Sequence, residues 1–165
     1  FRQPAHPEMG AYVDRMKGLL EEVPDPNTKV TLALALLQYC LFRADIGLAA
    51  TLMEKISPLM QSDEIAPLNK VFWWSRCGYV HYLDVDYARG HAALDQAQSI
   101  ATANGLGFTE MLTTFFRMLL RLTEQDLNNF EPFVRSIVSL SRPGPRLDAV
   151  YLNYAMGLLA SNTCA

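Results

Sequence analysis

Long hydrophobic runs and paired cysteines are both missing from this sequence. The longest apolar stretch, Val30 to Phe42, is shorter than the roughly 18 residues expected of a membrane-spanning helix, so we expect no membrane contact. The three cysteines, Cys40, Cys77 and Cys164, are single, widely spaced and odd in number. They therefore predict buried, reduced thiols in a cytoplasmic protein rather than a disulfide framework.

An excess of positive charge is also missing. The 165 residues include 14 Lys and Arg against 17 Asp and Glu, for a net charge of −3. A surface that contacts nucleic acid would need a basic stripe, so we expect no direct nucleic-acid contact. Half of the residues are hydrophobic and 19% are charged, which predicts a soluble globular chain that buries one sizeable core.

Motifs that carry catalysis or hold cofactors are absent as well. Gly105-Leu106-Gly107 follows a predicted helix and lacks the strand and the Lys of a phosphate loop, and no Gly-x-Ser-x-Gly or His-Glu-x-x-His sequence occurs. Cys77 and His81 stand one helical turn apart, but no second ligand pair accompanies them, so core packing is favoured over a metal site. Because no acid, base or nucleophile set converges, we expect no catalytic residues, metal, cofactor or enzyme activity.

The strongest positive pattern lies between Phe72 and Gly105. It resembles a tetratricopeptide repeat, whose first helix opens with Trp-x2-Leu-Gly-x2-Tyr. The residues at that spacing are Trp74, Cys77, Gly78 and His81. The residues at the places where the second helix of the repeat starts and packs on the first are Asp86, Tyr87, Gly90, Leu94 and Ala97. Small residues let two helix backbones approach closely, so this stretch predicts an antiparallel helical hairpin.

A short turn motif recurs along the chain. Asp45-Ile46, Asp86-Tyr87 and Asp126-Leu127 each follow an apolar helical pattern and precede another, at intervals of about 40 residues. Phe1-Arg2-Gln3-Pro4 aligns with Phe42-Arg43-Ala44-Asp45 at the same interval. Self-similarity at such a period predicts a solenoid, in which each unit buries its apolar face against its neighbours.

We therefore expect an all-α, right-handed superhelix of TPR-like antiparallel helix pairs, with about eight helices and a period of about 40 residues. Residues 1–165 would form one solenoid fragment of a larger protein, because the register begins inside a repeat and the first residue is Phe. Its parts would be an orphan second helix (1–23), three repeats (25–62, 66–105 and 107–142) and an orphan first helix (145–161). The helices are expected at about 7–22, 28–42, 46–61, 67–83, 87–104, 108–122, 127–141 and 146–161, with Pro58 kinking or ending the third.

In a right-handed stack of such hairpins, the first helices line the concave side. The tetratricopeptide resemblance places candidate binding residues there, namely Gln38, Phe42, Ser75, Tyr79, Tyr82, Arg117 or Arg121, and Tyr154 or its neighbour Tyr151. Tyr and Arg are favoured binding anchors because they combine a large area with a polar tip. Two alternatives stay open: Tyr79 and Tyr82 can instead pack between repeats, and Arg117 and Arg121, one turn apart, can grip a carboxylate or phosphate or be solvated surface.

A narrower resemblance rests on the run from Phe1 to Pro7, the segment from Pro24 to Asn27 and the long, irregular period. These features resemble the helical-repeat region of large bacterial signalling proteins, such as the maltose-type transcriptional regulators with a signal-transduction ATPase. The resemblance implies a non-catalytic protein-interaction scaffold or regulatory arm. The alternative is a small-molecule sensor that holds its inducer in the concave groove near Tyr79 and Tyr82. The expected partner is a protein or peptide, or a second copy bound through the exposed terminal helices.

Overall fold

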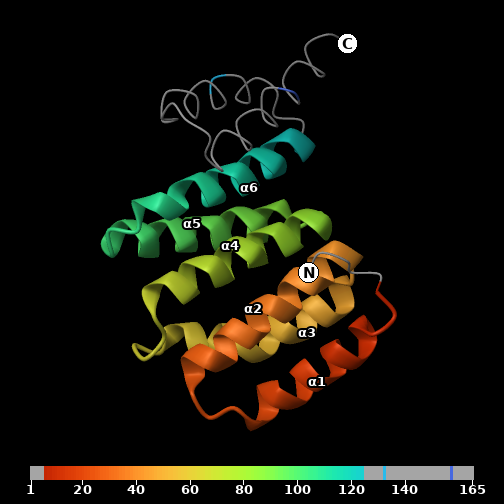
Figure 1. The fold of residues 1–165 in the computed structure, drawn as a ribbon. Coiled ribbons are helices and arrows are strands. Elements are labelled where there is room, and N and C mark those ends of the chain that lie inside the picture. The colour runs from red at the N-terminus through yellow and green to blue at the C-terminus, as the bar shows by residue number, and fades with distance from the viewer. Residues whose placement is uncertain (1–5, 125–131, 133–156, 158–165) are drawn as a thin grey trace.

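Six α-helices and two short 3-10 helices make up the part of the chain that the structure describes, residues 6–124 with the isolated Pro132 and Gly157, in a computed structural model. The α-helices are α1 (Met9–Glu22), α2 (Pro26–Arg43), α3 (Ile46–Ile56), α4 (Pro67–Leu83), α5 (Tyr87–Ala103) and α6 (Glu110–Thr123). The 3-10 helices are η1 (Ser57–Gln61), which continues α3, and η2 (Gly107–Thr109), which leads into α6. Neighbouring helices pack antiparallel, and α4 and α5 lie between α2 and α3 on one side and α6 on the other (Figure 1).

The all-α prediction is confirmed, whereas the predicted count of about eight helices is not observed. The helices expected at 127–141 and 146–161 lie outside the described residues, and so does the third turn motif at Asp126. Within the described part, α4 begins and ends where the sequence predicts. The helix that contains Pro58 changes to a 3-10 helix directly before that residue, because proline has no amide hydrogen to continue the ladder.

Three helix starts differ from prediction by two residues, and one of them is that of α6, which begins at Glu110 after the 3-10 helix η2 rather than at Phe108. The first α-helix begins at Met9 rather than Pro7, and its cap residue Glu8 makes no capping hydrogen bond from its side chain. The second begins at Pro26 rather than Thr28, since proline suits the first helical position. The side chain of Asp25 accepts a hydrogen bond from the Thr28 amide at 2.7 Å. Hydrogen bonding from the side chain of Thr28, and then from its backbone amide, lowers the pKa of the Asp25 carboxyl.

The turn between α2 and α3 and the turn between α4 and α5 are built alike. Ala44 and Val85 both adopt left-handed backbone, with φ of 52° and 61°. The next residue donates its amide hydrogen to a carbonyl of the preceding helix, from Asp45 to Cys40 at 3.0 Å and from Asp86 to His81 at 2.9 Å. The carboxylates of the same two aspartates then cap α3 and α5 by accepting an amide hydrogen bond, at 3.0 and 3.2 Å. The predicted turn motif is thus a pair of equivalent helix-ending and helix-starting structures.

The core lies along the line where successive helices meet. Trp73 of α4 is completely buried among residues of α2, α3 and η1, and its indole nitrogen donates a hydrogen bond to Ser57 Oγ at 3.1 Å. Asn27 at the start of α2 is bonded to the segment that leads into α4. Its amide nitrogen donates to the Glu64 carbonyl at 2.7 Å, and its amide oxygen accepts from the Ala66 backbone amide at 2.8 Å. These contacts hold α4 beside α2.

Candidate functional site

One face of the array is formed by α2, α4 and α6, because α4 packs against α2 on one side and against α6 on the other. The central part of this face consists of half-buried α4 side chains that follow one another at helical spacing, namely Phe72, Arg76, Tyr79 and Leu83. We call this surface the α2/α4/α6 face. Its members are Gln38, Phe42, Phe72, Arg76, Tyr79, Tyr82, Leu83 and Phe116.

Three aromatic rings on this face form a column that joins α4 to α6. The ring of Tyr79 stacks on that of Tyr82 with centroids 5.4 Å apart, and it also stacks on Phe116 at 5.0 Å. Such offset-stacked pairs stabilise their contact beyond the area they bury. The contact between Tyr79 and Phe116 favours the packing interpretation for this tyrosine, because the ring bridges α4 and α6.

Arg76 makes the matching bridge from α4 to α2. Its Nε donates a hydrogen bond to Gln38 Oε1 at 3.3 Å, and its guanidinium carbon lies 5.7 Å from the centre of the Phe72 ring. The predicted residue Gln38 therefore contacts Arg76, which was not among the predicted binding residues. The sequence pattern that could have predicted Arg76 on this face is its spacing, one helical turn after Phe72 and one before Tyr79.

The remaining predicted residues differ in their exposure and in their contacts. Phe42 is 54% exposed and offers a large ring surface to solvent. Ser75 does not face a groove, because it is completely buried and its hydroxyl donates to the Val71 carbonyl at 2.8 Å. Arg117 turns to α5, where it forms an ion pair with Asp95 at 2.8 Å. Arg121 is half-buried in α6, and Tyr151 and Tyr154 lie outside the described residues.

The helices of this face differ in charge from the protein as a whole. Together α2, α4 and α6 contain six Lys or Arg residues and a single acidic one, Glu110, although the full chain has a net charge of −3. Neither α2 nor α4 contains an Asp or Glu. The six basic residues are Lys29, Arg43, Lys70, Arg76, Arg117 and Arg121.

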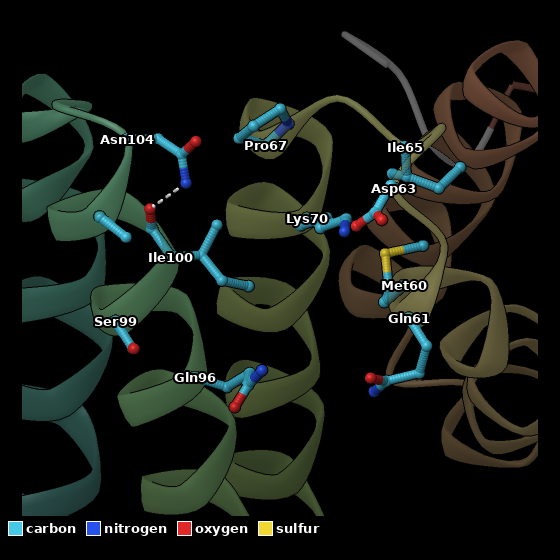
Figure 2. Close-up of a pocket in the computed structure, with 11 residues that line it drawn as sticks. Met60, Gln61, Asp63, Ile65, Pro67, Lys70, Gln96, Ser99, Ile100 and Asn104 are labelled. Atoms are coloured by element: carbon cyan, nitrogen blue, oxygen red, sulfur yellow. Dashed lines mark hydrogen bonds between the residues drawn. The ribbon is translucent and has the colours of Figure 1, made fainter.

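A pocket of about 390 Å³ lies away from this face, between η1, the start of α4 and the end of α5 (Figure 2). None of the predicted binding residues that the structure describes lines it. Its apolar floor contains Met60 and Ile65, both almost fully buried. The polar side chains around it are Gln61, Asp63, Lys70, Gln96, Ser99 and Asn104.

Cys40 and Cys77 are buried, and His81 is half-buried. Burial raises the pKa of the Cys40 thiol to about 11 and raises that of Cys77 further, so neither thiol ionises near neutral pH. Burial lowers the pKa of His81, whose Nδ1 is buried without a hydrogen-bond partner in the described part of the chain. Within residues 6–124 no three His, Cys, Asp or Glu side chains are grouped to hold a metal ion.

Comparison with known proteins identifies no relative of this chain. No protein family matches it, and no curated protein or solved structure is significantly similar to it. The chain is therefore assigned to no family. Among the described helices none is long and apolar enough to cross a membrane.

Proposed function

We propose that this chain is a non-catalytic helical-repeat scaffold that binds a protein or peptide partner on the α2/α4/α6 face. The observation that carries the proposal is the pair of equivalent turns at Ala44–Asp45 and Val85–Asp86, which share their backbone conformation, hydrogen bonds and caps in two successive hairpins. Equivalent turns orient successive hairpins alike, so their first helices share one side. In a superhelical stack this side would be the continuous binding surface.

The charge of the first helices narrows the class of partner. Neither α2 nor α4 contains an Asp or Glu, and Arg76 places a positive charge on the face itself, so an acidic segment would be steered toward this side. Lys70 and Arg117 do not add to this charge, because Lys70 lines the separate pocket and Arg117 is paired with Asp95. Exposed Phe42 adds apolar area, and the guanidinium of Arg76 adds positive charge next to Gln38 and Phe72. The partner that fits is an acidic peptide segment with at least one aromatic or aliphatic side chain.

The resemblance to the arm of maltose-type regulators extends this proposal to a role. The scaffold would then be the regulatory arm of a bacterial multidomain regulator in the cytoplasm, and the acidic segment would belong to another domain or a partner protein. Self-association through a terminal helix is the competing partner. It is supported by the exposed ring of Tyr12 on α1, which is 55% accessible.

The sensor alternative, with a ligand held in the concave groove near Tyr79 and Tyr82, has less support. The two rings are already stacked on each other, and Tyr79 also stacks on Phe116. A ligand would have to displace one of these ring contacts to stack there. An open face with an exposed apolar ring fits a macromolecular partner better than an enclosed small molecule.

The proposal is tested by selecting binders from a random peptide-display library with the purified chain. We expect enrichment of acidic peptides that contain an apolar anchor. Their affinity should fall with added salt and drop about tenfold in Arg76→Ala and in Phe42→Ala, as expected for the loss of a binding anchor. Arg15→Ala, an exposed cation on α1, is the matched control and should bind normally. Enrichment of neutral or basic peptides, or equal binding by all three variants, would contradict the proposal.

A further inference from the structure

The pocket beside η1 combines opposite charges with hydrogen-bonding side chains that are not used elsewhere. Figure 2 shows Lys70 of α4 and Asp63 of the preceding loop pointing toward one another, yet they form no direct ion pair. Their side chains, and those of Gln61, Gln96 and Ser99, make no hydrogen bond or ion pair to any described residue. The polar groups that converge on the pocket are therefore available to a ligand.

We propose that this pocket binds a small zwitterion of the α-amino acid class. An α-amino acid carries its carboxylate and its ammonium on the same carbon, so both charges reach neighbouring groups of opposite sign. Lys70 would take the carboxylate and Asp63 the ammonium, which are charge-assisted hydrogen bonds. A ligand with only one charge would leave the other protein charge uncompensated.

The remaining lining groups suit the ligand's side chain. The buried side chains of Met60 and Ile65 and the half-buried Ile100 give the pocket an apolar floor for methylene groups. The amide of Gln96 lies across the pocket on α5 and can donate and accept a hydrogen bond (Figure 2). The volume of about 390 Å³ lies at the small end of the usual range for ligand pockets, which favours a molecule of this size.

This site is separate from the proposed docking function, since it shares no residue with the α2/α4/α6 face. It is built from segments far apart in the sequence, at 60–70 and 96–104. Occupation of the pocket would therefore connect the first hairpin to the second.

The test is a nuclear magnetic resonance titration of the labelled 165-residue chain with the twenty L-amino acids at millimolar concentration, where weak ligands still bind measurably. We expect at least one to cause saturable shifts in the amide signals of residues 61–70 and 96–104. The N-acetyl and the carboxamide derivatives of that amino acid, each lacking one charge, should bind about tenfold more weakly or worse, as should Lys70→Ala and Asp63→Ala.

The matched control is Lys29→Ala, because Lys29 holds the equivalent place near the start of α2 and is outside the pocket. Lys29→Ala and Phe42→Ala should bind the amino acid normally. Since Phe42→Ala is expected to weaken only peptide docking, the two proposals can fail separately. Absence of shifts with every amino acid, shifts located elsewhere, or affinity that is unchanged in both Lys70→Ala and Asp63→Ala would overturn the inference.

Discussion

Gly78 of α4 and Gly90 of α5 lie directly against each other. A Cβ atom on Gly78 would stand 3.3 Å from the carbonyl oxygen of Gly90, and a Cβ on Gly90 would stand 3.5 Å from that of Gly78. A buried leucine also packs on each glycine. A Cβ atom on Gly78 would stand 2.8 Å from the Leu94 side chain, and one on Gly90 would stand 2.8 Å from that of Leu120. The absence of two side chains thus sets the spacing of this hairpin and of α6 beside it.

Gly78→Ala should destabilise the fold by about 1–3 kcal/mol, the usual cost of overpacking a filled core. The new methyl would meet Cγ and Cδ2 of Leu94, which is completely buried and has no room to move. Urea unfolding followed by circular dichroism would measure the change. The control is Gly18→Ala in α1, where nothing lies within 4 Å; there alanine should stabilise the helix by about 0.5–1 kcal/mol. Equal effects at the two sites would contradict the close contact.

Asn27→Ala should lower the free energy of unfolding by about 1–3 kcal/mol, because three hydrogen bonds between α2 and the start of α4 are lost. Two of them go to the backbone, and the third is accepted from the Asn69 side chain at 3.1 Å. Asn69→Ala removes only that third bond and should cost clearly less. Urea unfolding measures both free energies, and a larger loss for Asn69→Ala than for Asn27→Ala would contradict the prediction.

Val85→Gly should stabilise the protein by roughly 1 kcal/mol, because a β-branched residue with positive φ is strained and glycine is not. Val85 is 65% exposed, so little packing is lost. Ala44→Gly changes the equivalent turn and should stabilise less, since alanine is not β-branched. Thermal melting of both variants provides the measurement, and a lower melting temperature for Val85→Gly would show that the valine is not strained.

The pH dependence of stability should contain a contribution from His81. Burial lowers its pKa in the folded protein below the usual value of 6.5, so the unfolded chain binds the proton more readily. Stability from this group is therefore complete above about pH 6.5 and is lost as the pH falls through the folded pKa. We expect His81→Gln to flatten the decline of unfolding free energy between neutral and mildly acidic pH. If the unfolding free energy of His81→Gln declines with pH as steeply as that of the unchanged protein, groups other than His81 cause the decline.

Cys40 and Cys77 should resist alkylation in the native protein. Both thiols are buried, and burial raises their pKa, to about 11 for Cys40, so almost no thiolate is present at mildly alkaline pH. Iodoacetamide labelling followed by mass spectrometry should find both unmodified until denaturant is added. Rapid labelling of Cys77 under native conditions would contradict its burial.

Much of the local structure followed from the sequence alone. Pro67 at the first helical position and the apolar pattern after it predicted α4 to the residue, and Asp45 and Asp86 marked the starts of α3 and α5. These signals are local, since a cap or a proline acts on the amides of its own helical turn. The superhelix stays a prediction, because the third predicted repeat (107–142) extends beyond residue 124, where the continuous described part ends.

The placement of the site residues followed from the sequence only in part. Gln38 and Tyr79 were predicted on the binding face, but their partners Arg76 and Phe116 were not, and Ser75 was predicted accessible although it is buried. A rotation of one helix by a fraction of a turn decides between these outcomes. That rotation is set by packing against neighbouring helices, which no local pattern records.

The sequence by itself determined that residues 6–124 are helical, where α3, α4 and α5 begin, and that one turn recurs in successive hairpins. Local propensity, capping and periodicity suffice for these features. Only the tertiary structure decided which side chains meet. The pairing of Arg117 with Asp95, the column of Tyr82, Tyr79 and Phe116, and the pocket between residues 60–70 and 96–104 all join distant segments. Such contacts arise because packed helices fill space jointly, so the position of each side chain depends on all of its neighbours.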